Sequence, residues 1–109
     1  MILPPPTAGR GELAPFLKPT NTAKKGITKI NLLGEGRESS TRYGKGINVV
    51  CKIDNKKYIW TIRFDSPDRP SPNYRRLFER FGSDIKKWKG VVRVERKKHM
   101  GKEYIAVVD

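Results

Sequence analysis

One stretch of the chain limits the possible folds more than any other: Val49 to Phe64, which reads VVCKIDNKKYIWTIRF. Apolar and polar residues alternate on both sides of a short polar segment that contains Asn55. Alternation with a period of two is typical of a half-buried β-strand, and two such runs around an Asn-bearing turn indicate a β-hairpin. The sequence therefore predicts two antiparallel strands, INVVCKID and KYIWTIRF.

The faces of this hairpin follow from its loop length. With a two-residue loop at Asp54-Asn55 or at Asn55-Lys56, odd positions of the first strand share a face with even positions of the second. One face is then wholly apolar or aromatic: Ile47, Val49, Cys51, Ile53, Tyr58, Trp60, Ile62 and Phe64. The other is polar and basic with apolar contributions: Asn48, Val50, Lys52, Asp54, Lys57, Ile59, Thr61 and Arg63. We therefore expect the first face, Trp60 included, to build the core.

A strand is also predicted before the hairpin. The segment GITKINLLGEG puts Ile30 and Leu32 on one face, and Gly34 and Gly36 mark a sharp bend or a β-bulge. The segment RESSTRYGKG that follows is predicted to be a polar, basic loop.

A short helix and two more strands are predicted after the hairpin. Ser71 suits the N-cap, Pro72 the first helical position and Gly82 the stop. The apolar side of this helix, which we expect to pack on the sheet, is Tyr74, Leu77, Phe78 and Phe81. Beyond it we expect Trp88 to be buried at the helix junction, one strand through Val92 and Val94, a basic turn over residues 96–102, and a last strand over residues 104–108.

The chain of 109 residues is long enough for one domain. Residues 1–25 contain Pro4, Pro5, Pro6, Pro15 and Pro19, a composition that disfavours helix and sheet and predicts an irregular N-terminal arm. Within this arm, Phe16 and Leu17 are able to dock on the body. The folded domain is expected over residues 26–109.

The charge balance indicates a polyanionic partner. Lysine and arginine number 24 against 11 acidic residues, so the formal net charge is +13, which favours nucleic acid first and an anionic membrane second. The charged composition also suits a heat-adapted protein. Cys51 and His99 are each the single residue of their type, and no close carboxylate pair stands out, so we expect no enzyme activity, no metal and no cofactor. Neither a membrane span nor a signal peptide is evident, which predicts an intracellular, cytoplasmic protein.

The order of the predicted elements is typical of a five-stranded Greek-key barrel with its helix between the third and fourth strands. The stretches LLGEGRESSTRYGKGINVVCKIDNKKYIWTIRF and YRRLFERFGSDIKKWKGVVRVERKKHMGKEYIAVV resemble the OB-fold single-stranded DNA-binding proteins of phages and archaea. The most recognisable segment, FGSDIKKWKG, is similar to the G-x-D…W-x-G step between helix and fourth strand in that family. The resemblance extends over about residues 16–108.

The resemblance implies that single-stranded nucleic acid binds across the second and third strands and the two loops beside them. In this chain those positions are Lys52, Lys57, Ile59 and Arg63 on the hairpin, Arg37, Arg42, Tyr43 and Lys45 in the first loop, and Arg96, Lys97, Lys98, His99 and Lys102 in the second. Cations at several points suit a groove that follows the phosphate backbone. Tyr43 is the best stacking candidate, because the hairpin aromatics face inward, and Arg63 is able to lie flat on a base.

We therefore expect a non-enzymatic protein that binds single-stranded DNA with little sequence preference in replication, recombination or repair. Two alternatives stay open from the sequence. One is an RNA-binding OB module, because contact with a 2′-hydroxyl leaves no pattern in the sequence. The other is a protein-interaction OB subunit or a homodimer, formed through the arm or an edge strand.

Overall fold

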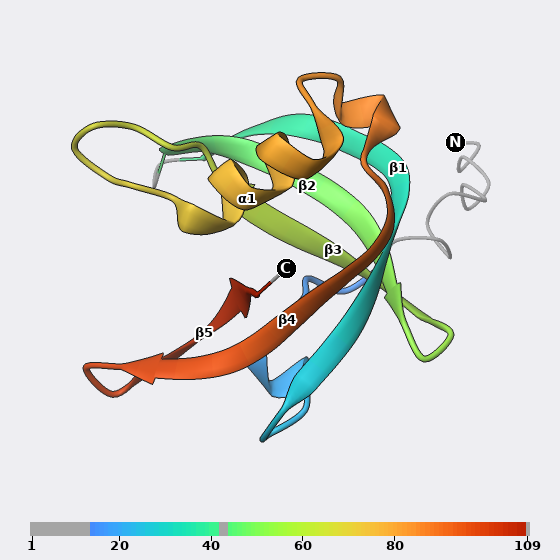
Figure 1. Ribbon diagram of the computed structural model, residues 1–109, viewed down its shortest axis with the longest axis vertical. Coiled ribbons are helices and arrows are strands. Elements are labelled where there is room, and N and C mark those ends of the chain that lie inside the picture. The colour runs from blue at the N-terminus through green and yellow to red at the C-terminus, as the bar shows by residue number, and fades with distance from the viewer. Residues whose placement is uncertain (1–13, 42–43, 109) are drawn as a thin grey trace, which may run out of the picture.

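The computed structural model describes residues 14–41 and 44–108. Within these ranges, five antiparallel strands form one sheet that curls into a half-barrel, and α1 lies across one end of it (Figure 1). The sheet order is β3-β2-β1-β4-β5. The elements are β1 (Ile27–Thr41), β2 (Gly44–Ile53), β3 (Lys56–Arg63), α1 (Pro72–Phe81), β4 (Lys89–His99) and β5 (Lys102–Val107), with 3-10 turns η2 (Pro19–Asn21) and η3 (Ile85–Lys87). The predicted class, all-β with one short helix, is confirmed.

The β2–β3 hairpin has the predicted two-residue loop. Asp54 and Asn55 form it with positive φ angles of 48° and 70°, the combination that matches the right-handed twist of adjoining strands. Val49 pairs with Trp60, and Trp60 is only 4% exposed. The prediction that the aromatic face of the hairpin is the core face is confirmed for Trp60, whereas Tyr58 and Phe64 are half-buried at its margin.

Strand β1 is the long strand that makes the sheet curl. It pairs with β4 from Ile27 to Leu33, and with β2 at Asn31 and Leu32 and again from Gly36 to Thr41. The register shifts between Leu32 and Gly36, where Gly34 has a φ of 75°, so the predicted bulge is confirmed. Such a bulge bends a strand and lets it serve two neighbours at different angles.

The prediction of a loop over RESSTRYGKG is wrong for most of that segment. Residues 37–41 continue β1 and residues 44–46 begin β2, with Arg37 opposite Asn48 and Ser39 opposite Gly46. The ladder hydrogen bonds satisfy the backbone although few apolar side chains are present. A search for alternating apolar residues misses a strand that is polar on both faces.

Gly46 allows a close approach of β3, because an added Cβ would lie 2.4 Å from the carbonyl oxygen of Ile62.

Helix α1 and Trp88 close the core at one end of the half-barrel. Ser71 is the N-cap and Gly82 the C-cap, as predicted. The Trp88 indole Nε1 donates to the Gly82 carbonyl oxygen at 2.9 Å, and the residue is 3% exposed, which confirms its burial. The fully buried side chain on the helix is Leu77, with Tyr74 and Phe81 packed beside it. Phe78 departs from the prediction, because 42% of it is exposed.

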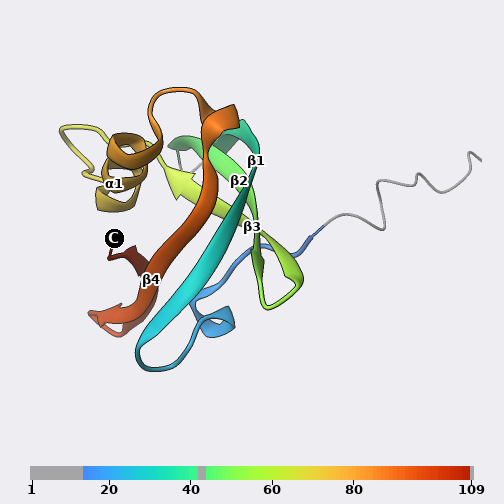
Figure 2. The same cartoon turned by 45° about the vertical axis from the view of Figure 1, so that its right-hand side comes forward.

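The described part of the N-terminal arm lies against the sheet. The Leu17 N–H donates to the Ile59 carbonyl oxygen at 2.7 Å, and the Ile59 N–H donates to the Pro15 carbonyl oxygen at 2.9 Å. Further along, Arg96 Nη2 donates to the Thr22 carbonyl oxygen at 2.7 Å, and Thr22 is buried. Residues 14–22 therefore pass along the edge of β3 (Figure 2), and Arg96 attaches them to β4.

Candidate nucleic-acid interface

The outer hairpin face is the side of β2 and β3 turned away from the core. It consists of four cross-strand pairs: Lys52 with Lys57, Val50 with Ile59, Asn48 with Thr61, and Gly46 with Arg63. Arg37 of β1 lies opposite Asn48 and extends the face onto a third strand. Val50 and Ile59 are half-buried and form an apolar strip, whereas Lys57 and Thr61 are exposed. The face thus carries an apolar strip with a lysine pair on one side and polar groups leading to Arg37 on the other.

The lysine pair is electrostatically unfavourable in the protein alone. Lys52 and Lys57 are directly opposite each other, and neither forms an ion pair with any residue in the part of the chain that the structure describes. Like charges directly opposite on neighbouring strands are destabilising. A bound anion would remove this repulsion.

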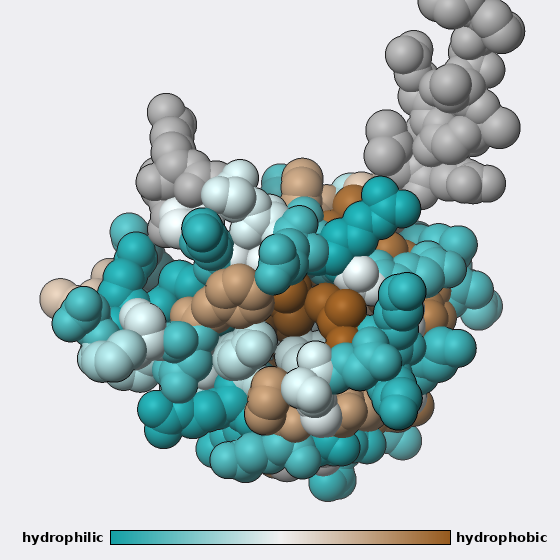
Figure 3. Space-filling model, turned by 90° about the horizontal axis from the view of Figure 1, so that it is seen from above, coloured by the Kyte–Doolittle hydropathy of each residue, from teal (hydrophilic) through white to brown (hydrophobic). Residues whose placement is uncertain are grey.

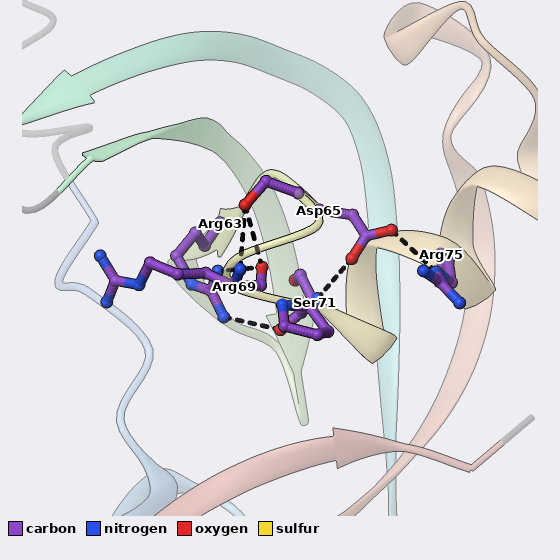
Figure 4. Close-up of polar contacts among 7 residues, drawn as sticks. Arg63, Asp65, Arg69, Ser71 and Arg75 are labelled. Atoms are coloured by element: carbon purple, nitrogen blue, oxygen red, sulfur yellow. Dashed lines mark hydrogen bonds and ion pairs between the residues drawn. The ribbon is translucent and has the colours of Figure 1, made fainter.

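Arg63 has a structural role at the end of this face. Its Nη1 donates to the Arg69 carbonyl oxygen at 2.5 Å and its Nη2 to the Pro70 carbonyl oxygen at 2.8 Å, as Figure 4 shows. The guanidinium therefore holds the loop between β3 and α1. Its plane is set by the two carbonyl groups, which leaves it less able to turn flat onto a base than the sequence analysis expected.

Asp65 fixes the other end of the same loop. Its Oδ1 accepts from the Ser71 N–H at 2.7 Å and its Oδ2 accepts from Arg75 Nε at 2.7 Å (Figure 4). The backbone hydrogen bond from Ser71, followed by the hydrogen bond from Arg75, lowers the pKa of the Asp65 carboxyl below its ordinary value. The carboxylate thus holds the backbone N–H of the N-cap residue and places a negative charge near the start of α1, whereas the Ser71 side chain makes no capping hydrogen bond.

The β4–β5 hairpin divides its basic residues between two faces. Lys97 is paired with Tyr104 and His99 with Lys102, so these four side chains share one face, and all are exposed. Lys98 and Arg96 lie on the opposite face with Glu103. The side chain of Arg96 is only 15% exposed. Its Nη1 lies 3.1 Å from Oε2 of Glu103, and its Nη2 donates to the Thr22 carbonyl oxygen. Arg96 therefore fastens the arm to the sheet.

Tyr104 is a candidate site residue that the sequence analysis missed. It is 44% exposed and lies directly opposite Lys97. The signal was present in KEYIAVV, because Ile105 and Val107 are core residues and strand alternation then turns Tyr104 outward. An aromatic ring beside cations is the combination that single-strand binding sites use.

A groove of about 410 Å³ joins the two basic regions. It lies between β3 and β5 beside the start of α1, and it brings Arg63 and Lys97 together with Thr61, Arg76 and Tyr104. Asn73 forms one side of it by bonding the edge of β5 as a strand would: its Nδ2 donates to the Ile105 carbonyl at 2.7 Å, and its Oδ1 accepts from the Val107 N–H at 2.9 Å. The rim that includes Tyr104 is thereby held in place.

The first predicted loop supplies fewer candidate residues whose position the structure describes. Arg42 and Tyr43 lie outside the described residues. Lys45 is exposed near the start of β2, opposite Ser40, and Arg37 is exposed on β1. The described candidates therefore fall into two sets, one on the β1-β2-β3 side and one on the β4–β5 hairpin.

The end of the molecule near α1 has a different character. Figure 3 shows apolar surface in the middle of this end, surrounded by hydrophilic side chains. A crevice of about 160 Å³ opens here, lined by Phe64, Phe78, Ile85 and Trp88 among others. Among the described residues, no cation lines this crevice, which sets it apart from the basic surface.

Among the described residues, no three histidine, cysteine or acidic side chains lie together in a way that would hold a metal ion. Cys51 is completely buried, and burial raises the pKa of its thiol to about 12. Its Sγ lies 3.6 Å from the Tyr58 carbonyl oxygen.

Comparison of the chain with protein-family models, with characterised proteins and with solved structures finds no match. Across the described ranges, no helix has the length and apolar character needed to cross a membrane.

Proposed function

We propose that the protein is an OB-type Greek-key barrel that binds single-stranded DNA without catalysis and with little sequence preference. The sheet order β3-β2-β1-β4-β5, with α1 between β3 and β4, supports this topology because the two edge strands β3 and β5 are those that such a barrel brings together. In replication, recombination or repair, such a protein would protect or present exposed single strands.

The observation that carries the proposal is the outer hairpin face. Its apolar strip of Val50 and Ile59 lies beside lysines 52 and 57, which form no ion pair with the described residues, and Arg37 extends the positive charge onto β1. Cations attract the phosphate backbone and release its counterions, and apolar or aromatic side chains then contact the bases. Neither step reads base identity, which accounts for the proposed low sequence preference.

Binding is tested with labelled single-stranded DNA, single-stranded RNA and duplex DNA at several salt concentrations. We expect preference for single strands and an affinity that falls steeply with salt. Equal binding to duplex DNA, or no binding at moderate salt, would contradict the proposal. Equal or tighter binding to RNA would move the assignment to an RNA-binding module.

The lysine pair provides a sharper test within the same assay. Replacing Lys52 and Lys57 together by alanine should lower the slope of log affinity against log salt by about 1.4, because each phosphate contact on a single strand contributes about 0.7. The matched control is the double replacement of Lys86 and Lys87 by alanine. Both lysines are exposed on η3, and their replacement removes the same amount of charge. If both double variants change the slope equally, net charge and not the outer hairpin face determines binding.

A further inference from the structure

The N-terminal arm adds an aromatic side chain to the outer hairpin face. Phe16 forms an isolated parallel bridge with Ile59, and the hydrogen bonds of Pro15 and Leu17 to Ile59 flank it on either side. Residues paired across a β-bridge turn their side chains to the same face. Because Ile59 belongs to the outer hairpin face, the Phe16 ring lies on that face as well.

The burial of the neighbouring residue agrees with this orientation. Leu17 packs against the hydrophobic core, whereas Phe16 is 57% exposed. Successive residues of an extended segment point to opposite sides, so an inward Leu17 requires an outward Phe16. At this single β-bridge the arm therefore lies along the edge of β3 as a strand would, with one apolar residue inside and one outside.

Phe16 extends the apolar strip to a third chain segment. Phe16, Ile59 and Val50 lie side by side across the arm, β3 and β2. Neighbouring strands are about 4.8 Å apart, so the strip gains the width of one strand and ends in an exposed aromatic ring. Lys57 and Thr61 flank the strip along β3, and Lys52 lies opposite Lys57.

We propose that Phe16 is a stacking platform for a base of the bound single strand. This inference rests on the proposed function. Phe16 gives the outer hairpin face an aromatic ring, which Trp60 does not provide because its side chain points into the core. A phenylalanine ring stacks on any base because every base has a π-face, and lysines two residues away are in place to hold the adjacent phosphates. The same lysines favour nucleic acid over an apolar protein surface as the occupant.

The test compares Phe16→Ala, Phe16→Leu and Phe16→Tyr in binding to a labelled oligothymidine at fixed salt. Loss of one stacking contact should weaken binding by roughly 5- to 150-fold in the alanine variant. Leucine should restore little of this affinity and tyrosine most of it, because only tyrosine keeps an aromatic plane. The salt slope should stay at the wild-type value in all three, because no phosphate contact is removed.

Phe78→Ala is the matched control, since Phe78 is also a partly exposed phenylalanine but lies on α1 by the apolar crevice. It should bind as the wild type does. A further readout is the tryptophan fluorescence of a Phe16→Trp variant. Oligothymidine should quench the emission of the introduced indole, and the wild type, in which Trp60 and Trp88 are both buried, gives the reference signal.

The outcomes separate this inference from the proposed function. If the wild type binds no nucleic acid, the proposed function fails. If the wild type binds and Phe16→Ala binds equally well with an unchanged melting temperature, the proposed function stands and the role of Phe16 is refuted. Leucine and tyrosine variants of equal affinity would refute stacking. A wild-type dimer that Phe16→Ala converts to monomers, with unchanged DNA affinity, would refute it in favour of self-association.

Discussion

Val49 and Trp60 are directly paired across the β2–β3 hairpin, and both side chains are buried in the core. Their neighbours along the two strands, Val50 and Ile59, are paired with each other on the opposite face of the same hairpin. One hairpin thus supplies both the centre of the core and the centre of the proposed binding surface. Substitutions one residue apart should therefore affect different properties.

Trp60→Ala should lower stability and leave the binding surface in place. Large-to-small replacement of a buried aromatic residue costs about 3–5 kcal/mol, through lost burial and the cavity left behind. Chemical denaturation checks this value, with Thr61→Ala as the exposed neighbouring control. A Trp60→Ala variant of normal stability that no longer binds DNA would show that the assignment of the two faces is wrong.

Asp65→Asn should lower the melting temperature at neutral pH by a few degrees. Hydrogen bonds from Ser71 and Arg75 favour the ionised carboxylate, so the pKa of Asp65 is lower in the folded protein than its ordinary value of 3.8. Its contribution to stability is therefore fully present above that value and is lost as the pH falls through the folded pKa.

Thermal melts of wild type and Asp65→Asn between pH 7 and pH 2 check this pH dependence. The difference in melting temperature should be constant near neutral pH and shrink below about pH 4. Asp68→Asn, an exposed change in the same loop, is the control. A difference that grows toward low pH would have the wrong sign and would exclude this role for Asp65.

Cys51 should be unreactive in the native protein. Its side chain is completely buried and burial raises the pKa of its thiol to about 12, so almost no thiolate is present or accessible at neutral pH. A chromogenic disulfide reagent should label it slowly in buffer and completely in guanidinium chloride. Rapid labelling of the folded protein would show that β2 and β3 separate readily.

Tyr104→Ala should weaken single-strand binding by roughly tenfold, within the range for one aromatic platform. Tyr104→Phe should bind nearly as the wild type does, because the ring and not the hydroxyl makes the contact. Lys97→Ala, across from it on β4, should instead reduce the salt slope. If Tyr104→Ala leaves affinity unchanged, the bound strand does not extend to the β4–β5 hairpin.

Several features of the molecule follow from local sequence alone. The two-residue turn at Asp54-Asn55 and strand alternation were enough to assign Trp60 to the core. The bounds of α1 follow from Ser71 and Gly82, and the bulge in β1 from its glycines. All of these depend on residues a few positions apart, because turn geometry and strand periodicity are short-range properties.

Other features depend on contacts between distant segments, and only the tertiary structure decided them. Phe16 reaches the outer hairpin face because the arm bonds the edge of β3, some forty residues later in the chain. Arg63 and Arg96 appear in the sequence as free cations, yet backbone carbonyls of other segments hold both. Composition indicates how much positive charge is present, but hydrogen-bond partners brought together by folding determine which cations remain available to a ligand.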